Sequence, residues 1–228
     1  MKTYLIVCAM EEELSAFFDG LTFSKETHRG IEMCVAHSQC SMVYGMLGGI
    51  GKVNMAYRLG KILGEIDVDE VINVGVAGSL SPKLQPLKTL VATRCAYHDV
   101  DVTAFGYTYG QMAGEPLYFD CDKEEVKRAK NIDPENIVTG LILSGDSFMT
   151  KEKIKTSSCA RFADPLAIDM ESAAVAQVCT NEKISFLIIR SISDDAEGNR
   201  ENRKQYDQLL QEASLRAGQI ARKLVVRN

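Results

Sequence analysis

Short runs rich in Val, Ile and Leu recur along the chain and predict β-strands. They lie at residues 3–9, 31–38, 41–47, 70–77, 90–97, 137–143 and 185–191. Most are nearly continuous apolar stretches, which is typical of strands that are buried on both faces. The pattern therefore predicts a sheet in the interior of the protein.

Between these runs, apolar residues recur at the three- and four-residue spacing of amphipathic helices. Such spacing covers residues 14–21, 53–63, 173–178 and 206–224, with stop signals at Asp19-Gly20 and Gly64. Strands that alternate with helices predict an α/β layered fold around a largely parallel or mixed sheet. Since no Pro/Ser-rich linker or internal repeat divides the chain, we expect one domain over residues 1–228.

The composition argues against several classes of function. The 228 residues carry 26 Lys and Arg against 31 Asp and Glu, a net charge of −5. This acidic balance argues against a partner that is a nucleic acid or an anionic membrane, because both require concentrated positive charge. No stretch approaches the roughly 20 apolar residues that span a bilayer. Seven cysteines without a CxxC pair favour reduced thiols, and we expect a cytoplasmic protein.

The first apolar run offers one alternative to a cytoplasmic location, a secretion signal. It lacks a small-residue cleavage site and continues directly into Glu11, Glu12 and Glu13. We therefore interpret it as the first buried strand.

Candidate chemistry lies where the predicted strands end, because ligands of open α/β sheets bind at the carboxyl ends of strands. These positions hold Met10-Glu11-Glu12-Glu13, Gly78-Ser79, Ser144-Gly145-Asp146-Ser147-Phe148 and Arg190 with Ser193-Asp194-Asp195, while Asp169-Met170-Glu171 precedes the third helix. Recurring carboxylates suit acid/base chemistry. Local pattern alone leaves open that Glu13 and Glu171 only favour helix N-termini, that Asp194 is a turn residue and that Phe148 is a core residue.

The sequence fits the motifs of other kinds of catalytic or binding site poorly. None of the three histidines accompanies a GxSxG elbow, and GxGxxG is absent. His98-Asp99-Val100-Asp101 lacks a second ligand cluster, so we expect no metal and no cofactor. Residues 48–52 (GGIGK) fail the phosphate-loop pattern at Met46 and Val53, and predict a tight strand-to-helix turn. Residues 99–120 differ, because aromatic residues stand among Gly without helical period, which is typical of a functional or interface loop.

Several of these segments resemble one family when they are taken together and in order. AMEEEL, GGIGKV, NVGVAGSL, YHDVDVTAFGYTYGQ, SGDSF, DMESAAVAQVC and RSISDDA are similar to the motifs of 5′-methylthioadenosine/S-adenosylhomocysteine nucleosidases, within the purine nucleoside phosphorylase-like superfamily. The resemblance implies a three-layer αβα domain with a mixed central sheet and a homodimer with shared active sites. It implies hydrolysis of the N9–C1′ bond of an adenine nucleoside that carries a 5′-thio substituent, with 5′-deoxyadenosine as a further substrate.

The resemblance also assigns roles. Glu13 corresponds to the general base that activates water, and Asp194 to the general acid toward purine N7. Arg190 is expected near the water and the carboxylates, as one of the substrate-binding residues. Glu171 is expected to hold the ribose hydroxyls, and Phe148 to stack on the purine. The remaining expected substrate contacts are Val76, Gly78, Met149, Met170, Ser193 and Tyr206, and from the partner subunit Val102, Phe105 and Tyr107. Two departures are Val76, where many relatives have a hydroxyl, and Asp169, which is one methylene shorter than the usual Glu.

Three alternatives remain open at this point. A phosphorylase of the same fold would use phosphate in place of water, although the Glu13 carboxylate would repel a phosphate dianion. A nucleosidase for aminodeoxyfutalosine would keep the hydrolysis and change the substrate. A non-catalytic purine-binding protein would have no use for a general base.

Overall fold

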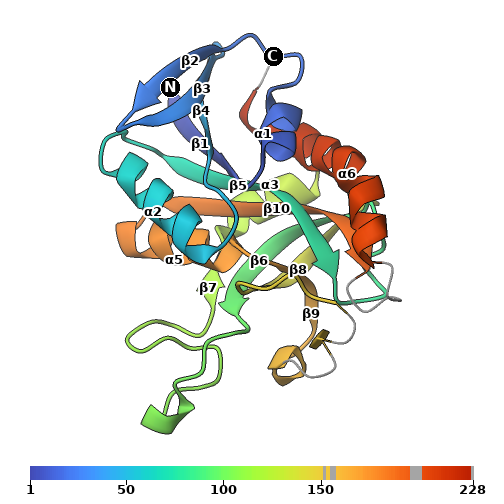
Figure 1. The fold of residues 1–228 in the computed structure, drawn as a ribbon. Helices are drawn as coiled ribbons and strands as arrows, with labels where there is room; N and C mark the ends of the chain where they lie inside the picture. The colour runs from blue at the N-terminus through green and yellow to red at the C-terminus, as the bar shows by residue number, and fades with distance from the viewer. Residues whose placement is uncertain (151–152, 155–157, 196–201, 227–228) are drawn as a thin grey trace.

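A computed structural model describes residues 1–150, 153–154, 158–195 and 202–226. Its ribbon is a strand-rich interior with helices on the outside (Figure 1). The strands are β1 (Lys2–Cys8), β2 (Ser24–His28), β3 (Ile31–His37), β4 (Ser41–Leu47), β5 (Glu70–Ser79), β6 (Thr89–Tyr97), β7 (Phe119–Asp120), β8 (Ile137–Ser144), β9 (Pro165–Asp169) and β10 (Ser185–Asp195). The helices are α1 (Glu11–Phe18), α2 (Lys52–Leu63), α3 (Lys123–Lys130), α5 (Ser172–Glu182) and α6 (Asn202–Val225), with short 3₁₀ turns at Thr103–Phe105 and Ser158–Arg161.

All these strands belong to one mixed sheet. Its order is β10-β6-β8-β9-β5-β1-β4-β3-β2, and β7 pairs with β6. β1 is parallel to β4 and β5, whereas β9 is antiparallel to β5. β10 pairs with both β5 and β6, so the sheet closes into a ring at one end. The prediction of a mixed central sheet is confirmed.

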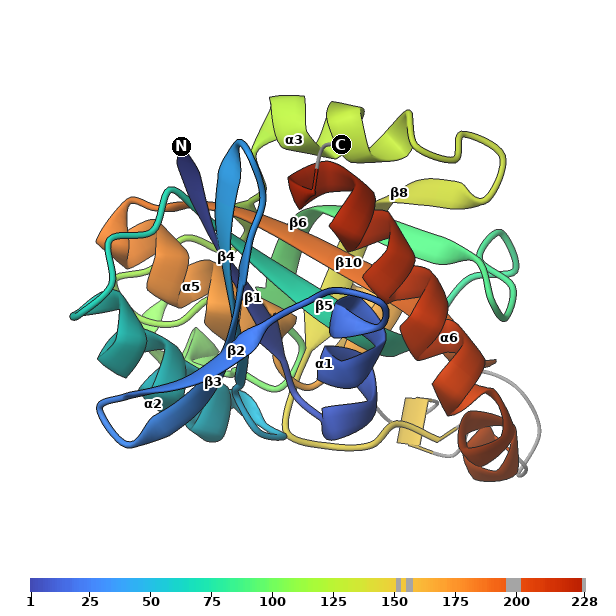
Figure 2. The ribbon, with the colours of Figure 1, turned by 90° about the horizontal axis from the view of Figure 1, so that it is seen from above.

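Helices cover the sheet on two sides. α1 packs against α6 on one side and α2 packs against α5 on the other (Figure 2). α5 is buried along most of its length, because its alanines at 173, 174 and 176 allow close approach to the sheet. The three-layer αβα arrangement expected from the motifs is therefore confirmed.

The turns that lead to the sheet edge follow the sequence pattern closely. β1 runs into α1 after two residues, and the turn at 48–51 ends directly in α2. Gly49 and Gly51 have φ of 82° and 92°, a left-handed conformation that favours glycine. Both short turns bring helix N-termini to the carboxyl ends of the strands.

Three other observations concern the projecting segment, the cysteines and the helices. Residues 98–118, between β6 and β7, extend away from the body of the molecule (Figure 1). All seven cysteines are free thiols; five are buried, whereas Cys34 is half-buried and Cys40 is exposed. None of the helices in the described ranges has both the length and the apolar character that crossing a bilayer needs.

Candidate active site

A cavity of about 400 Å³ opens at the carboxyl ends of β5, β9 and β10. Most of the residues expected to contact substrate line it: Glu13, Val76, Gly78, Phe148, Met170, Glu171, Ser193, Asp194 and Tyr206. A small adjoining hollow is lined by Met149, together with Gly78 and Phe148. Residues from distant parts of the chain therefore meet at one place, which is where α/β folds place ligands.

Glu13 is held rigidly beside β5. It is the third residue of α1, and its Oε2 accepts hydrogen bonds from the main-chain N–H groups of Ala9 (2.9 Å) and Met10 (3.0 Å), while Oε1 accepts one from Val76 (2.9 Å). Burial raises the pKa of Glu13, and Arg190 and the N–H donors oppose that shift. Those donors satisfy the ionised carboxylate, which is the form a general base requires.

Asp194 reaches the cavity through an irregularity in β10. The register against β5 shifts between Ile192 and Asp194, which pairs Asp194 with Gly78. Such a bulge turns a side chain toward a site that regular alternation would not reach. The carboxylate is buried and its Oδ1 accepts a hydrogen bond from the Ser193 hydroxyl (2.9 Å). Glu13 and Asp194 thus line one cavity from two different elements.

Glu171 is a third buried carboxyl group at the cavity. It stands at the N-cap of α5, and its Oε1 accepts a hydrogen bond from the Gly51 N–H (2.8 Å). Burial, followed by the nearby charge of Asp169, raises the pKa of Glu171 to about 8. The group therefore holds a proton at neutral pH in the unliganded protein and can both donate and accept hydrogen bonds.

Arg190 lies beneath the cavity and does not line it. Its buried guanidinium pairs with Asp169 (2.9 Å) and donates to the Asn73 side chain. Asp169 also accepts hydrogen bonds from the hydroxyls of Ser144 and Ser172. Sequence reasoning identified Arg190 and the short carboxylate at 169. Ser144 was among the polar residues expected at strand ends, without a role. Asn73 and Ser172 were missed, because the strand and helix patterns do not distinguish them from core positions.

Two aromatic rings form an apolar wall. Phe148 and Tyr206 meet edge to face with centroids 5.7 Å apart, and the Tyr206 hydroxyl donates to Met10 Sδ (3.3 Å). The Phe148 side chain is 39% exposed, so it is not the core residue that local pattern left open. Ile50 and Met10 also line the cavity. Met10 was among the residues expected at a strand end, but no role was predicted for either residue, since both are ordinary apolar side chains.

Comparison with known proteins places this arrangement in a family. A family model described as the phosphorylase superfamily matches residues 3–226. A 5′-methylthioadenosine/S-adenosylhomocysteine nucleosidase of Bacillus subtilis is 35% identical over 227 residues, covering 97% of each chain. The chain belongs to this nucleosidase family. The resemblance drawn from the sequence motifs is thereby confirmed.

Solved structures of nucleosidases share the fold closely. A putative nucleosidase from Borrelia burgdorferi bound to adenine superposes with a TM-score of 0.91 at 33% identity, covering 97% of this chain and 98% of the other. The nucleosidase of S. pneumoniae with a transition-state inhibitor gives 0.88 at 36% identity, with 96% of each chain covered. Similarity at this level over nearly the whole length supports comparable placement of the strand ends.

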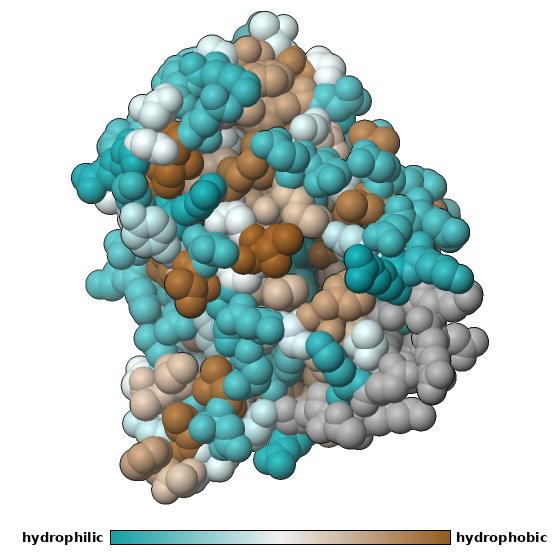
Figure 3. All heavy atoms as spheres, viewed as in Figure 1, coloured by the Kyte–Doolittle hydropathy of each residue, from teal (hydrophilic) through white to brown (hydrophobic). Residues whose placement is uncertain are grey.

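The residues expected to serve a nucleosidase partner subunit do not line the cavity of their own chain. Val102, Phe105 and Tyr107 lie on the projecting segment 98–118, and Phe105 is 81% exposed. Apolar side chains gather on this projection in the space-filling view (Figure 3). A site shared between two subunits therefore stays a prediction.

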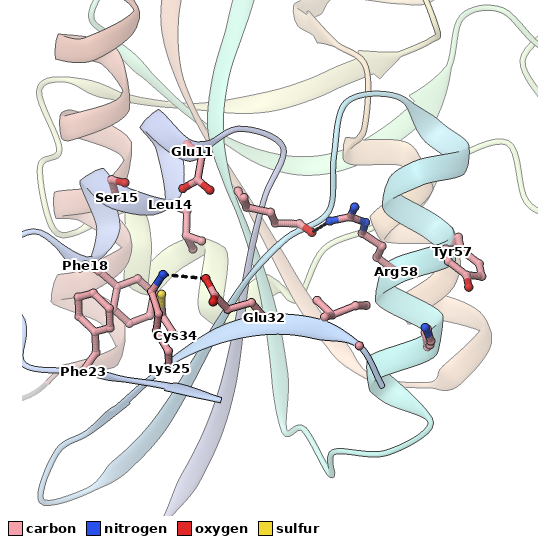
Figure 4. Close-up of a pocket in the computed structure, with 14 residues that line it drawn as sticks. Glu11, Leu14, Ser15, Phe18, Phe23, Lys25, Glu32, Cys34, Tyr57 and Arg58 are labelled. Atoms are coloured by element: carbon pink, nitrogen blue, oxygen red, sulfur yellow. Dashed lines mark hydrogen bonds and ion pairs between the residues drawn. The ribbon is translucent and has the colours of Figure 1, made fainter. Parts of the chain in front are cut away.

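A second cavity, of about 560 Å³, lies between α1, the β2–β3 hairpin and α2 (Figure 4). It is larger, but none of the residues predicted for the nucleosidase site lines it. Lys25 pairs with Glu32 (2.7 Å), and Arg58 donates to the Leu47 carbonyl (3.0 Å). We therefore assign the active site to the cavity that holds the buried carboxylates.

Proposed function

We propose that this chain hydrolyses the N9–C1′ bond of 5′-methylthioadenosine and S-adenosylhomocysteine, and also of 5′-deoxyadenosine. The products are adenine and the 5-substituted ribose. The observation that carries the proposal is the pair of buried carboxylates, Glu13 and Asp194, at one cavity with an aromatic wall. The nucleosidase relatives and their complexes with adenine and inhibitors support it.

In the proposed mechanism Asp194 is the general acid. Cleavage leaves negative charge on the purine, and a proton delivered to N7 neutralises it. Asp194 is buried at the cavity, and the Ser193 hydroxyl donates a hydrogen bond to its Oδ1. Glu13 takes a proton from the attacking water and faces the oxocarbenium ion that develops on the ribose. Two carboxyl groups with different surroundings can thus take opposite roles.

Substrate binding in this proposal uses the remaining wall of the cavity. Glu171 hydrogen-bonds the ribose hydroxyls, and Met170 packs beside the sugar. Phe148 stacks on the purine, while main-chain groups of Met149 read its edge. Tyr206 closes over the 5′ substituent, where sulfur contacts with aromatic rings are worth up to about 1.5 kcal/mol.

Water rather than phosphate is the proposed nucleophile. In this mechanism the Glu13 carboxylate faces the approaching nucleophile, and its negative charge would repel a phosphate dianion. Adenine release from 5′-methylthioadenosine, measured with and without phosphate, tests this point. We expect equal rates and free 5-methylthioribose; a phosphorylated sugar would identify a phosphorylase. A panel of 5′-substituted adenosines that includes aminodeoxyfutalosine tests the substrate.

We also propose that the protein is a cytoplasmic homodimer. Exposed apolar side chains on the projecting segment and on α2 support an interface, namely Phe105, Met112, Val53 and Tyr57. In the dimer, Val102, Phe105 and Tyr107 would complete the 5′ pocket of the partner subunit. Seven free thiols are consistent with a reducing compartment.

A further inference from the structure

Three charged residues form a closed set of contacts beside the proposed site. Lys52 Nζ lies 2.6 Å from Asp99 Oδ2 and 3.7 Å from Asp146 Oδ2. The Lys52 main-chain N–H donates to Asp146 Oδ1 (2.8 Å), and the Asp146 N–H donates to Asp99 Oδ2 (2.9 Å). The set therefore joins the N-terminus of α2, the segment after β6 and the segment after β8 by side-chain and main-chain contacts.

The position of Lys52 is unfavourable without these carboxylates. It is the first residue of α2, where the helix dipole disfavours a positive charge. α2 has no acidic residue in its first turn, and its N-cap, Gly51, offers no side chain to bind the free N–H groups. Asp146 supplies the missing acceptor from another part of the chain, and Asp99 neutralises the lysine.

Each of the three segments also carries a residue of the proposed site. The Gly51 N–H, adjacent to Lys52, donates to Glu171 Oε1 (2.8 Å). Phe148 follows Asp146 by two residues, and Asp99 is the second residue of the projecting segment 98–118, which carries Phe105. Gly51 is also packed tightly here, since a Cβ atom there would lie 3.1 Å from Asp146 Oδ1.

We propose that Lys52, Asp99 and Asp146 are positioning residues that fix Phe148 and Glu171 relative to each other. The inference rests on the proposed nucleosidase function, and none of the three touches the reacting atoms. An ordinary surface ion pair contributes little to stability. Here, two carboxylates accept main-chain N–H groups from other segments, so their removal frees the loop that carries the purine-stacking ring.

The test compares Asp146→Ala with Asp146→Asn and with a matched control, Asp122→Ala. Asp122 likewise accepts main-chain N–H groups at a helix N-terminus (2.9 and 3.0 Å), but that helix, α3, contributes no residue to the lining of the cavity. We expect Asp146→Ala to raise KM for 5′-methylthioadenosine about tenfold with kcat within about threefold, because loose positioning weakens binding. The amide introduced by Asp146→Asn retains an oxygen that can accept from the Lys52 N–H, so that variant should stay near the parent.

Hydrogen exchange of the unliganded protein provides a readout that does not depend on activity. Asp146→Ala should exchange faster over residues 145–150 and 98–107, and Asp122→Ala should not. If Asp146→Ala alters KM and exchange in these segments no more than Asp122→Ala does, the positioning role is wrong. A parent protein that releases no adenine would instead contradict the proposed function, and the exchange comparison would still decide the role of the three residues.

Discussion

The three buried carboxyl groups at the cavity accept hydrogen bonds from different donors. Glu13 receives three main-chain N–H groups, Asp194 receives a hydroxyl, and Glu171 receives one N–H group beside another carboxylate. N–H donors favour an ionised acceptor, whereas burial and a neighbouring negative charge favour a protonated one. Glu13 and Glu171 therefore have different surroundings although both line the same cavity.

At the residue scale, the sharpest prediction concerns the two carboxylates that we propose as catalytic, Glu13 and Asp194. Glu13→Ala and Asp194→Asn should each lower kcat by at least about 10²-fold, the usual contribution of general acid–base catalysis. Adenine release under substrate saturation measures the loss. Circular dichroism checks the fold, because Glu13→Ala leaves three main-chain N–H groups without their acceptor. Turnover near the parent level in either variant would refute the role of that residue.

Glu171 gives a prediction on stability and pH. Its pKa rises on folding from 4.5 to about 8, so the folded protein binds the proton more tightly than the unfolded chain. The stability that this tighter proton binding gives the folded protein is fully present below about pH 4.5, and it is lost as the pH rises toward 8. Gln is neutral at every pH, so Glu171→Gln does not suffer this loss. The variant should therefore gain stability relative to the parent between about pH 5.5 and 8. We expect a gain of about 1 kcal/mol or more, because one pKa unit corresponds to about 1.4 kcal/mol.

Urea denaturation of the parent and of Glu171→Gln, at about pH 5.5 and at about pH 8, measures this gain in the free energy of unfolding. Other titrating groups are common to parent and variant, so they largely cancel in the difference. A difference in unfolding free energy that does not change with pH would show that Glu171 is already ionised in the folded protein.

At the element scale, continuous apolar runs located most of the buried strands, but not the short buried strand β9. The run at residues 41–47 matches β4, and the run at 90–97 differs from β6 by one residue. β2 was missed because its sequence, SKETH, is polar and almost wholly exposed as an edge strand of the sheet. α3 was missed because only Val126 and Ala129 of its eight residues are buried. Patterns of burial cannot reveal elements that bury so little.

The candidate site was predictable for a different reason. Its residues follow strand ends in short motifs, and the family resemblance assigned their roles. The supporting contacts were not predictable, because they depend on three-dimensional register. The bulge in β10 that turns Asp194 toward Gly78 and the buried pair of Arg190 with Asp169 are examples. Long-range pairing of this kind leaves no local signal in the chain.

Gly75 supports a prediction about β5. A Cβ atom there would lie 2.3 Å from Glu13 Oε1 and 3.2 Å from an Arg190 nitrogen, so the strand admits only glycine beside the base. Gly75→Ala should displace Glu13 and lower kcat by about 10²-fold, as loss of the base would. Gly60→Ala in α2 is the control, since a Cβ atom there meets nothing within 4 Å. It should leave kcat unchanged, and equal kcat in both variants would contradict the packing argument.

At the scale of the whole molecule, the closed end of the sheet and the projecting segment have opposite characters. β10 pairs with β5 and β6, which fixes the strand ends that carry Asp194, Val76 and Gly78. Segment 98–118 instead leaves the body and exposes the aromatic ring of Phe105. A rigid half-site with an exposed apolar extension is what a shared site between two identical subunits requires, because each subunit then supplies what the other lacks.

Subunit mixing tests that arrangement directly. Phe105→Ala should raise KM about tenfold, corresponding to the roughly 1.5 kcal/mol of a sulfur–aromatic contact. Asp194→Asn should be nearly inactive, yet its Phe105 is intact. If Phe105 serves the partner subunit, a mixed dimer has one complete site. Random exchange at equal concentrations makes about half of the dimers mixed, so about one quarter of all sites should regain the parent KM. If Phe105 serves its own subunit, no mixture can combine it with Asp194, and only the high-KM activity of the Phe105→Ala chains would remain.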